Sequence, residues 1–142
     1  ILTLTGGDLK INKTTSQTVL VVYRQGFIDI FTGNYNCQEP DVPVSVNYDV
    51  VLEADTSVKN RILISNFWGY ADDISKVYID LKSTVDSVYL PSQSFTDKAN
   101  RSYTVSGAGR YVVADGSIWL SYTLTQNSGS FTESGEQVYT RK

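Results

Sequence analysis

The feature that most restricts the fold of this chain is the two-residue alternation of apolar and polar side chains along most of its length. Successive side chains of a strand point to opposite faces of a sheet, so this period is typical of strands with one buried face. No stretch of eight or more residues has a helical period, which excludes a parallel βαβ topology. The fold class is therefore all-β, an antiparallel meander that forms a barrel or a two-sheet sandwich. The clearest run, 44–54, places on one face Val44, Val46, Tyr48, Val50, Leu52 and Ala54.

Segment 102–126 carries the strongest hairpin signal, because Asp115 and Gly116 stand between two alternating runs. Both central positions of a type I′ turn need a positive φ, which these residue types tolerate. The expected turn pairs Ala114 with Ser117 and so sets the register of the two strands.

The first strand of that hairpin has two glycines, Gly107 and Gly109, on the same face as Tyr103 and Tyr111. Glycine on an inward face weakens a flat strand. It also lets a strand bend sharply, or lets a large side chain from across the core lie over the backbone. We therefore expect a barrel corner at this point.

Shorter alternating runs bring the expected number of strands to about ten. The run 27–37 is interpreted as one strand, and 76–95 as a hairpin with its turn at 83–86. The best helix signal is a single turn before the second of these segments, capped by Asp72 or Asp73.

Length and charge limit the organisation and the partners of the chain. Its 142 residues fit one domain, which buries roughly two-thirds of its unfolded surface. The net charge is −3 and the 12 basic residues are scattered, so nucleic acid is not an expected partner. No apolar run approaches the roughly 18 to 20 residues of a membrane-spanning helix. A transmembrane segment is therefore not expected.

The chain contains no methionine, not even at its first residue, Ile1. This favours a processed piece of a longer precursor, from which an export signal or a lipid anchor has been removed. The single cysteine, Cys37, cannot form an internal disulfide and is interpreted as a small buried side chain.

The residue types give little support for catalysis. Because the sequence has no histidine, zinc sites of the usual kind and Ser/His or Cys/His nucleophile pairs are excluded. The strand acids Asp49, Glu53 and Asp80 alternate onto the face away from the apolar residues, and only Asp29 shares parity with apolar neighbours. No Asp-x-Asp-x-Asp-Gly spacing supports a calcium loop. We expect no enzyme activity, no metal site and no cofactor.

The aromatic residues are more informative, with 10 Tyr, 5 Phe and 2 Trp in the chain. Tyrosine and tryptophan combine a large apolar body with a polar edge, which suits barrel lumens, protein interfaces and sugar-stacking platforms. Exposed aromatics at a rim or on a sheet face indicate binding best. The predicted ligand-binding residues are Trp68 and Tyr70 beside a strand end, Trp119 on an outer strand face, and Tyr78 and Tyr89 in the 76–95 hairpin.

Five short motifs occur in order along residues 27–142: TGNY (32–35), ILISNFWG (62–69), VYLPSQSF (88–95), YTVSGAGRY (103–111) and GSIWLSYTL (116–124). In this order they resemble the calycin superfamily, and in particular the lipocalin-like domains of secreted and lipid-anchored bacterial surface proteins. TGNY looks like the Gly-x-aromatic opening of a calycin's first strand, with Tyr35 where tryptophan is usual. Arg141 looks like the basic residue that those barrels place against this aromatic. The resemblance implies that Gly33, Tyr35 and Arg141 close one end of a barrel.

The resemblance further implies a calycin or lipocalin-like barrel over residues 27–142 and a secreted, periplasmic or cell-surface location. Residues 1–26 lie outside the pattern. They are expected to be extra strands of the same domain or the last hairpin of a preceding one.

Two binding hypotheses remain, since every motif is a signature of fold and none is catalytic. The first is a non-enzymatic binding or adhesion module that contacts a protein or glycan through Trp68, Tyr70 or Trp119. It requires a largely filled barrel and at least one tryptophan more than a third exposed. The alternative is a lipocalin-type carrier of a small apolar ligand, which requires a closed cavity of roughly several hundred Å³ in the lumen.

Overall fold

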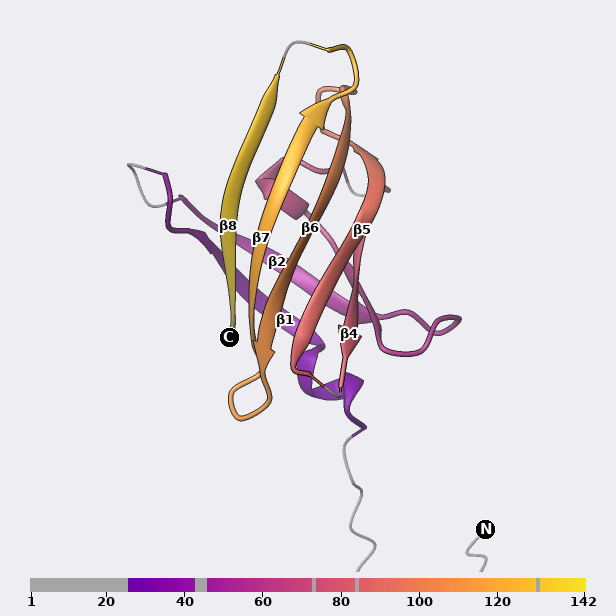
Figure 1. Ribbon diagram of the computed structural model, residues 1–142, viewed down its shortest axis with the longest axis vertical. Coiled ribbons are helices and arrows are strands. Elements are labelled where there is room, and N and C mark those ends of the chain that lie inside the picture. Colours follow the sequence, from indigo (N-terminus) through magenta and orange to yellow (C-terminus); the bar gives the residue numbers. More distant parts are fainter. Residues whose placement is uncertain (1–25, 43–45, 73, 84, 130) are drawn as a thin grey trace, which may run out of the picture.

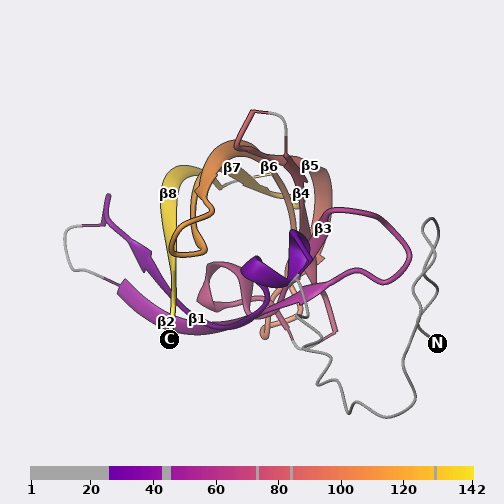
Figure 2. The ribbon, with the colours of Figure 1, turned by 90° about the horizontal axis from the view of Figure 1, so that it is seen from below.

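Eight antiparallel strands form a closed barrel in a computed structural model that describes residues 26–42, 46–72, 74–83, 85–129 and 131–142. Each strand pairs with the next along the chain, and the last pairs with the first, as Figures 1 and 2 show from two directions. The all-β meander expected from the alternation is therefore confirmed, as a barrel rather than a sandwich. The strands are β1 (Gly33–Glu39), β2 (Val46–Ala54), β3 (Arg61–Ile64), β4 (Val77–Lys82), β5 (Ser87–Thr96), β6 (Ser102–Val112), β7 (Ser117–Gln126) and β8 (Thr132–Arg141).

The beginning of the chain differs from the expectation at one boundary. The predicted N-terminal segment, residues 1–26, lies outside the described residues except for Gly26, and its strands stay a prediction. The run 27–37 is not a single strand, because Ile28–Phe31 forms a one-turn 3₁₀ helix, η1, and β1 begins at Gly33. Gly33 has a φ of +126°, a conformation that side chains rarely adopt, so it suits the change of direction from η1 into β1.

Side chains that alternate inward from the strands fill the lumen. Val77, Ile79 and Leu81 of β4 are buried, as the alternation predicted, and so is Leu52 of β2. Val46 is an exception, since it is exposed where β2 begins, beside a hollow described below. The core is therefore continuous through the barrel but stops short of one end of β2.

The two inward glycines of β6 allow an unusually close approach to β7. A Cβ atom would lie 2.1 Å from the backbone oxygen of Ser121 at Gly107, and 1.9 Å from that of Trp119 at Gly109. Both separations are far below van der Waals contact. The near neighbour is backbone rather than a large side chain from across the core, so the second of the two reasons expected from the sequence does not apply.

The turn between β6 and β7 is wider than the expected two-residue turn. Val112 pairs with Ser117, so Ala114 does not face Ser117 and the predicted register is wrong by two residues. Gly116 has a φ of +71° and a Cβ there would lie 2.9 Å from the backbone oxygen of Ile30. The turn is therefore shaped by contact with η1, a segment far away in the sequence.

Helical structure is limited to single turns in the described residues. The described residues around Asp72 do not form the expected helical turn. The Asp72 carboxylate instead accepts hydrogen bonds from the backbone N–H groups of Ile74 and Ser75. One turn occurs earlier instead, as η2 (Phe67–Gly69), and it lies at the end of the barrel opposite η1 (Figure 1). None of these described helical turns has the length and apolar character needed to cross a membrane.

Candidate functional site

A hollow opens at the seam of the barrel, where β1 and β8 part. These strands pair only from Tyr35 and Arg141 to Gln38 and Val138, whereas β8 begins as early as Thr132. Beyond the last pair, a hollow of about 340 Å³ is lined by residues of β1, β8, β7 and the η2 segment. We call it the seam hollow and define it by three aromatic and four acidic side chains: Trp68, Tyr70, Tyr122, Glu39, Asp41, Glu133 and Glu136.

The backbone of the η2 segment brings Trp68 to the seam hollow in a rare conformation. Asn66, Trp68 and Gly69 have φ values of +53°, +59° and +68°. The left-handed region costs a residue with a side chain roughly 1–2 kcal/mol, so the surrounding structure must hold Trp68 there. Residues held in such conformations cluster at functional sites.

Packing on both sides of Trp68 supplies that restraint. Phe67 is fully buried, and its ring lies edge-on to those of Phe95 and Tyr122, with centroids 5.6 and 5.9 Å apart. On the other side, a Cβ at Gly69 would lie 3.2 Å from the ring of Tyr48, so the absence of a side chain lets the backbone rest on that ring. Phe67 thus anchors the segment in the core, and the next side chain, Trp68, is partly buried where it packs against that core.

The indole of Trp68 is oriented by contacts at its edge and with neighbouring rings. Its Nε1 donates a hydrogen bond to Glu133 Oε1 at 3.1 Å. Its ring lies 5.0 Å from Tyr70 and 5.4 Å from Tyr103, measured between centroids. Phe131, at 6.2 Å, completes the group. Because Tyr70 is 56% exposed, this aromatic group is open to solvent on one side.

Glu133 links the aromatic wall to β8. Its Oε1 accepts hydrogen bonds from Trp68 and, at 2.8 Å, from the hydroxyl of Tyr122. Hydrogen bonds to a charged acceptor are stronger than those between neutral groups. Both bonds end on the same oxygen, so among the described residues Oε2 is the atom of Glu133 that remains for a ligand in the hollow.

Glu39 is the most buried acid of the seam hollow, at 7% exposed. Its Oε1 accepts hydrogen bonds from the Tyr48 hydroxyl at 2.7 Å and from Gln137 Nε2 at 3.1 Å. Gln137 in turn accepts a hydrogen bond from the hydroxyl of Tyr139. No other described residue donates to the carboxylate, so Glu39 also has Oε2 for a ligand.

Burial shifts the protonation equilibria around Glu39. It raises the pKa of the Glu39 carboxyl, the hydrogen bonds from Tyr48 and Gln137 oppose that rise, and the charge of Glu133 adds to it. Burial also raises the pKa of the Cys37 thiol to about 12, so this thiol is protonated at neutral pH. Cys37 is fully buried, as expected from its parity in the strand.

The five predicted ligand-binding aromatics do not lie together. Trp68 and Tyr70 line the seam hollow, Tyr78 and Tyr89 lie on β4 and β5, and Trp119 lies on β7. The structure therefore brings two of the five to one hollow and places the other three on the strands.

Basic side chains lie over the rings of the two tyrosines on β4 and β5. The guanidinium of Arg61 lies 3.8 Å from the ring centroid of Tyr78, which is half-buried. The ammonium of Lys82 lies 5.7 Å from that of Tyr89, which is 49% exposed. Of the two, Tyr89 offers the more accessible ring.

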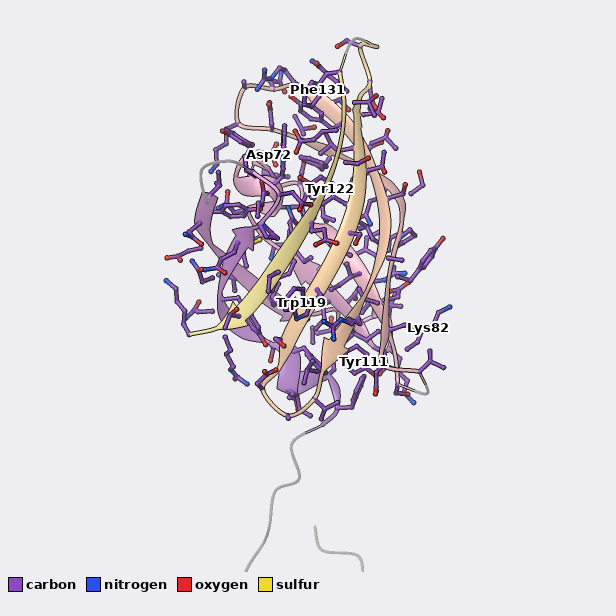
Figure 3. The ribbon with its side chains drawn as sticks, turned by 60° about the vertical axis from the view of Figure 1, so that its left-hand side comes forward. Asp72, Lys82, Tyr111, Trp119, Tyr122 and Phe131 are labelled. Atoms are coloured by element: carbon purple, nitrogen blue, oxygen red, sulfur yellow. The ribbon has the colours of Figure 1, made fainter. Side chains whose placement is uncertain are left out.

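Trp119 lies on the outer face of the barrel, away from the seam hollow. Figure 3 shows it between Phe131 near one end and Tyr111 near the other. Its side chain is 39% exposed, with the guanidinium of Arg110 5.0 Å from the ring centroid. Trp119 is therefore the tryptophan that is more than a third exposed, whereas Trp68 is partly buried and has the exposed ring of Tyr70 beside it.

The three residues predicted to close the barrel lie at the η1 end. Tyr35 and Arg141 are cross-strand partners in β1 and β8. The Tyr35 hydroxyl lies 3.1 Å from the backbone oxygen of Gly116 and 3.3 Å from that of Ile30. Arg141 Nη1 donates to the same Ile30 oxygen at 3.2 Å, and a Cβ at Gly33 would lie 3.7 Å from Arg141 Nη2. This group ties η1 to the barrel.

Glu39 and Glu133 are not among the acids singled out from the sequence. A signal for both was present, however. Glu39 continues the inward parity of Tyr35 and Cys37 in β1, and Glu133 continues that of Tyr139 in β8. A carboxylate on an inward strand face must be hydrogen-bonded to be tolerated, so parity alone could have identified both as unusual.

In comparisons with known proteins, no family model, curated protein or solved structure matches this chain. The resemblance to calycins therefore rests on the motifs, and the structure supports it at the level of an eight-stranded barrel. In the described part of the chain, no three His, Cys, Asp or Glu side chains lie close enough to hold a metal ion.

Proposed function

We propose that this domain is a non-enzymatic binding module with a calycin-like barrel, and that it contacts a protein or glycan partner at the seam hollow. The observation that carries the proposal is the presentation of Trp68. Its backbone occupies a destabilised conformation, held by a buried neighbour, and the result is an aromatic ring beside hydrogen-bonded carboxylates. A secreted or cell-surface location belongs to the same proposal and is supported by the motif resemblance.

The rim of the barrel is a better binding surface than its lumen. Side chains such as Leu52, Ile79 and Leu120 are buried in the lumen, and the seam hollow is open to solvent rather than enclosed. A carrier of a small apolar ligand needs an enclosed and mostly apolar cavity. The acids of the seam hollow suit a polar or charged group instead.

The proposal is tested by a binding screen against immobilised glycans and purified surface proteins. We expect Trp68→Ala and Tyr70→Ala each to abolish binding and Trp119→Ala to bind as wild type. Tyr70→Ala matters because this ring is largely exposed, so its loss should leave the fold intact. Circular dichroism checks that fold. Binding that is lost only with Trp119→Ala would move the surface to β7, and equal binding by all variants would overturn the proposal.

A second candidate, a glycoside hydrolase, is favoured by one observation. Glu39 and Glu133 line the same hollow, and burial raises the pKa of Glu39, as it does for the general acids of such enzymes. The test is turnover of a panel of chromogenic aryl glycosides. The binding proposal expects no turnover, whereas turnover that Glu39→Gln abolishes would establish the hydrolase.

A further inference from the structure

The lining of the seam hollow indicates the chemical class of its ligand. Its acids share the hollow with aromatic rings, and no basic residue is among the described residues that line it. We propose that the seam hollow binds an alkylammonium group, carried by a free amine or by a lysine side chain of a partner. This inference rests on the proposed binding function and specifies the ligand of the same site.

The two inner carboxylates are arranged as acceptors for such a group. Glu39 and Glu133 each receive their hydrogen bonds on Oε1, from Tyr48 and Gln137 in one case and from Trp68 and Tyr122 in the other. These bonds fix the orientation of each carboxylate and leave Oε2 for the N–H donors of an ammonium.

Burial of Glu39 increases the benefit of a counter-charge. A carboxylate removed from water interacts more strongly with a nearby cation than an exposed one does. At 7% exposed, Glu39 is largely removed from water, and the hollow gives a ligand access to it. Burial also raises the pKa of Glu39, because the ionised carboxylate is less stable away from water.

The aromatic wall adds a second attraction for a cation. Trp68 and Tyr70 stand 5.0 Å apart with their rings inclined at 60°, so they form a corner rather than a stack. A cation over the face of a tryptophan or tyrosine is attracted by the ring quadrupole. The indole N–H of Trp68 is bonded to Glu133, so the edge of the ring is fixed.

Two basic side chains near the aromatic group have hydrogen-bond partners of their own. Arg101 lines a second hollow on the other side of Trp68, where its guanidinium bonds to the buried carboxylate of Asp97 at 2.7 Å. Lys98 donates a hydrogen bond to the side-chain oxygen of Asn66. The charge of Arg101 is therefore paired with a carboxylate outside the seam hollow.

Size favours an organic cation over a metal ion. No three carboxylates of the described residues converge closely enough to ligate a metal. The hollow of about 340 Å³ lies in the range of small-molecule sites. Its acids are thus spaced around a volume that an alkylammonium group, rather than a bare ion, can occupy.

Titration calorimetry with matched ligands tests the inference. The probes are n-butylammonium as a free amine, N-acetyl-lysine-N-methylamide as a lysine side chain, and butan-1-ol as an uncharged molecule of similar shape. The proteins are wild type, Glu39→Gln, Glu133→Gln and a control, Glu53→Gln. Glutamine keeps an oxygen that can accept the existing hydrogen bonds. Glu53 lies on β2 and pairs with Lys76 on the outer face, so its loss removes the same charge elsewhere.

We expect at least one ammonium probe to bind wild type and Glu53→Gln with equal affinity. Its affinity for Glu39→Gln and for Glu133→Gln should be lower by about tenfold or more. Wild type should bind butan-1-ol more weakly than this probe by a similar factor. The ammonium probe that binds more tightly shows whether the hollow prefers a free amine or a lysine side chain. Equal binding of butan-1-ol, or unchanged affinity in both hollow variants, would overturn the inference. So would the absence of any ammonium binding. None of these results decides the proposed function, which is tested separately by the binding screen. A glycan or protein whose binding requires Trp68 would still support it.

Discussion

Each end of the barrel is closed by a one-turn helix, and the two ends differ in the side chains around that helix. At each end a one-turn helix presses a fully buried phenylalanine into the core, Phe31 in η1 and Phe67 in η2. At the η1 end, Phe31 packs on Phe27 and Tyr111 at centroid separations of 5.5 and 4.9 Å. At the η2 end, the residue after Phe67 is Trp68, which is partly buried against the core and also lines the seam hollow.

The difference shows how a hollow lined by aromatic and acidic side chains can be added to a barrel without loss of the core. Phe67 performs the same packing as Phe31, so the residue that follows it is free to serve another purpose. Trp68 uses a left-handed backbone to reach the hollow, whereas Ile30, just before Phe31, offers its backbone oxygen to Tyr35 and Arg141. We infer that the η1 end provides stability and the η2 end provides recognition.

The largest effect should come from Phe31→Ala at the η1 end. Truncation of a buried phenylalanine costs about 3–5 kcal/mol of the free energy of unfolding. At the other end, Tyr70→Ala removes a ring that is 56% exposed and should cost only about 1 kcal/mol, the value of one aromatic contact. Urea unfolding followed by circular dichroism measures both. A loss for Tyr70→Ala as large as that for Phe31→Ala would show that the exposed rings of the η2 end also carry the stability of the barrel.

A pair of turn glycines should give the next largest difference. Gly116→Ala meets the backbone oxygen of Ile30 at 2.9 Å, while Gly129, in the β7–β8 turn of the η2 end, has nothing within 4 Å of its Cβ position. Both have positive φ, which costs an alanine roughly 1–2 kcal/mol. The contact should add about 1–3 kcal/mol for Gly116→Ala alone. Thermal unfolding of the two variants checks this. Equal shifts in Tm would argue against tight packing between the Gly116 turn and η1.

Removal of one hydroxyl at each end should give a smaller contrast. Tyr35→Phe leaves the buried oxygen of Gly116 without its hydroxyl partner and should cost about 1 kcal/mol. Tyr122→Phe should cost about half of that, because Glu133 keeps the bond from Trp68 and lines an open hollow that water can enter. Chemical denaturation at pH 7 provides the comparison. A costlier Tyr122→Phe would mean that the Glu133 cluster, too, is structural.

The smallest expected effect is a pH-dependent stabilisation by Glu39→Gln. Burial raises the pKa of Glu39 in the folded state above its unfolded value, so the folded state binds this proton more tightly. The contribution of Glu39 to stability therefore falls as pH rises from the unfolded pKa through the folded one. Glu39→Gln should gain stability over wild type across that window and keep the gain at neutral pH. Tm values measured between acidic and neutral pH test the sign; a gain confined to acidic pH would contradict it.

The sequence predicted the parts of the fold that depend on local pattern. Val77, Ile79 and Leu81 face the core because a strand buries alternate side chains, and this requires no knowledge of the rest of the chain. The β6–β7 register was wrong because the turn at Gly116 is shaped by contact with Ile30. Ile30 and Gly116 are 86 positions apart, so the sequence around the turn gives no information on this contact.

The candidate site was predicted only in part for a similar reason. Trp68 and Tyr70 stand out locally as aromatics beside a glycine at a strand end. Glu39 and Glu133 become a pair only where β1 and β8 part, and the length of their pairing follows from the closure of the whole barrel. Parity could identify each acid as inward, but not their common hollow.

The most direct test of this division between the ends uses the two tryptophans as separate reporters. Trp68 lines the seam hollow and Trp119 lies on the outer face of β7, and the chain has no others. The measurement is the shift of the two indole N–H signals in a ¹H–¹⁵N spectrum, assigned with Trp119→Phe, as the tightest ligand from the screen is added to saturation. We expect the Trp68 signal to move and the Trp119 signal to stay. Movement of the Trp119 signal alone would contradict a binding surface at the η2 end.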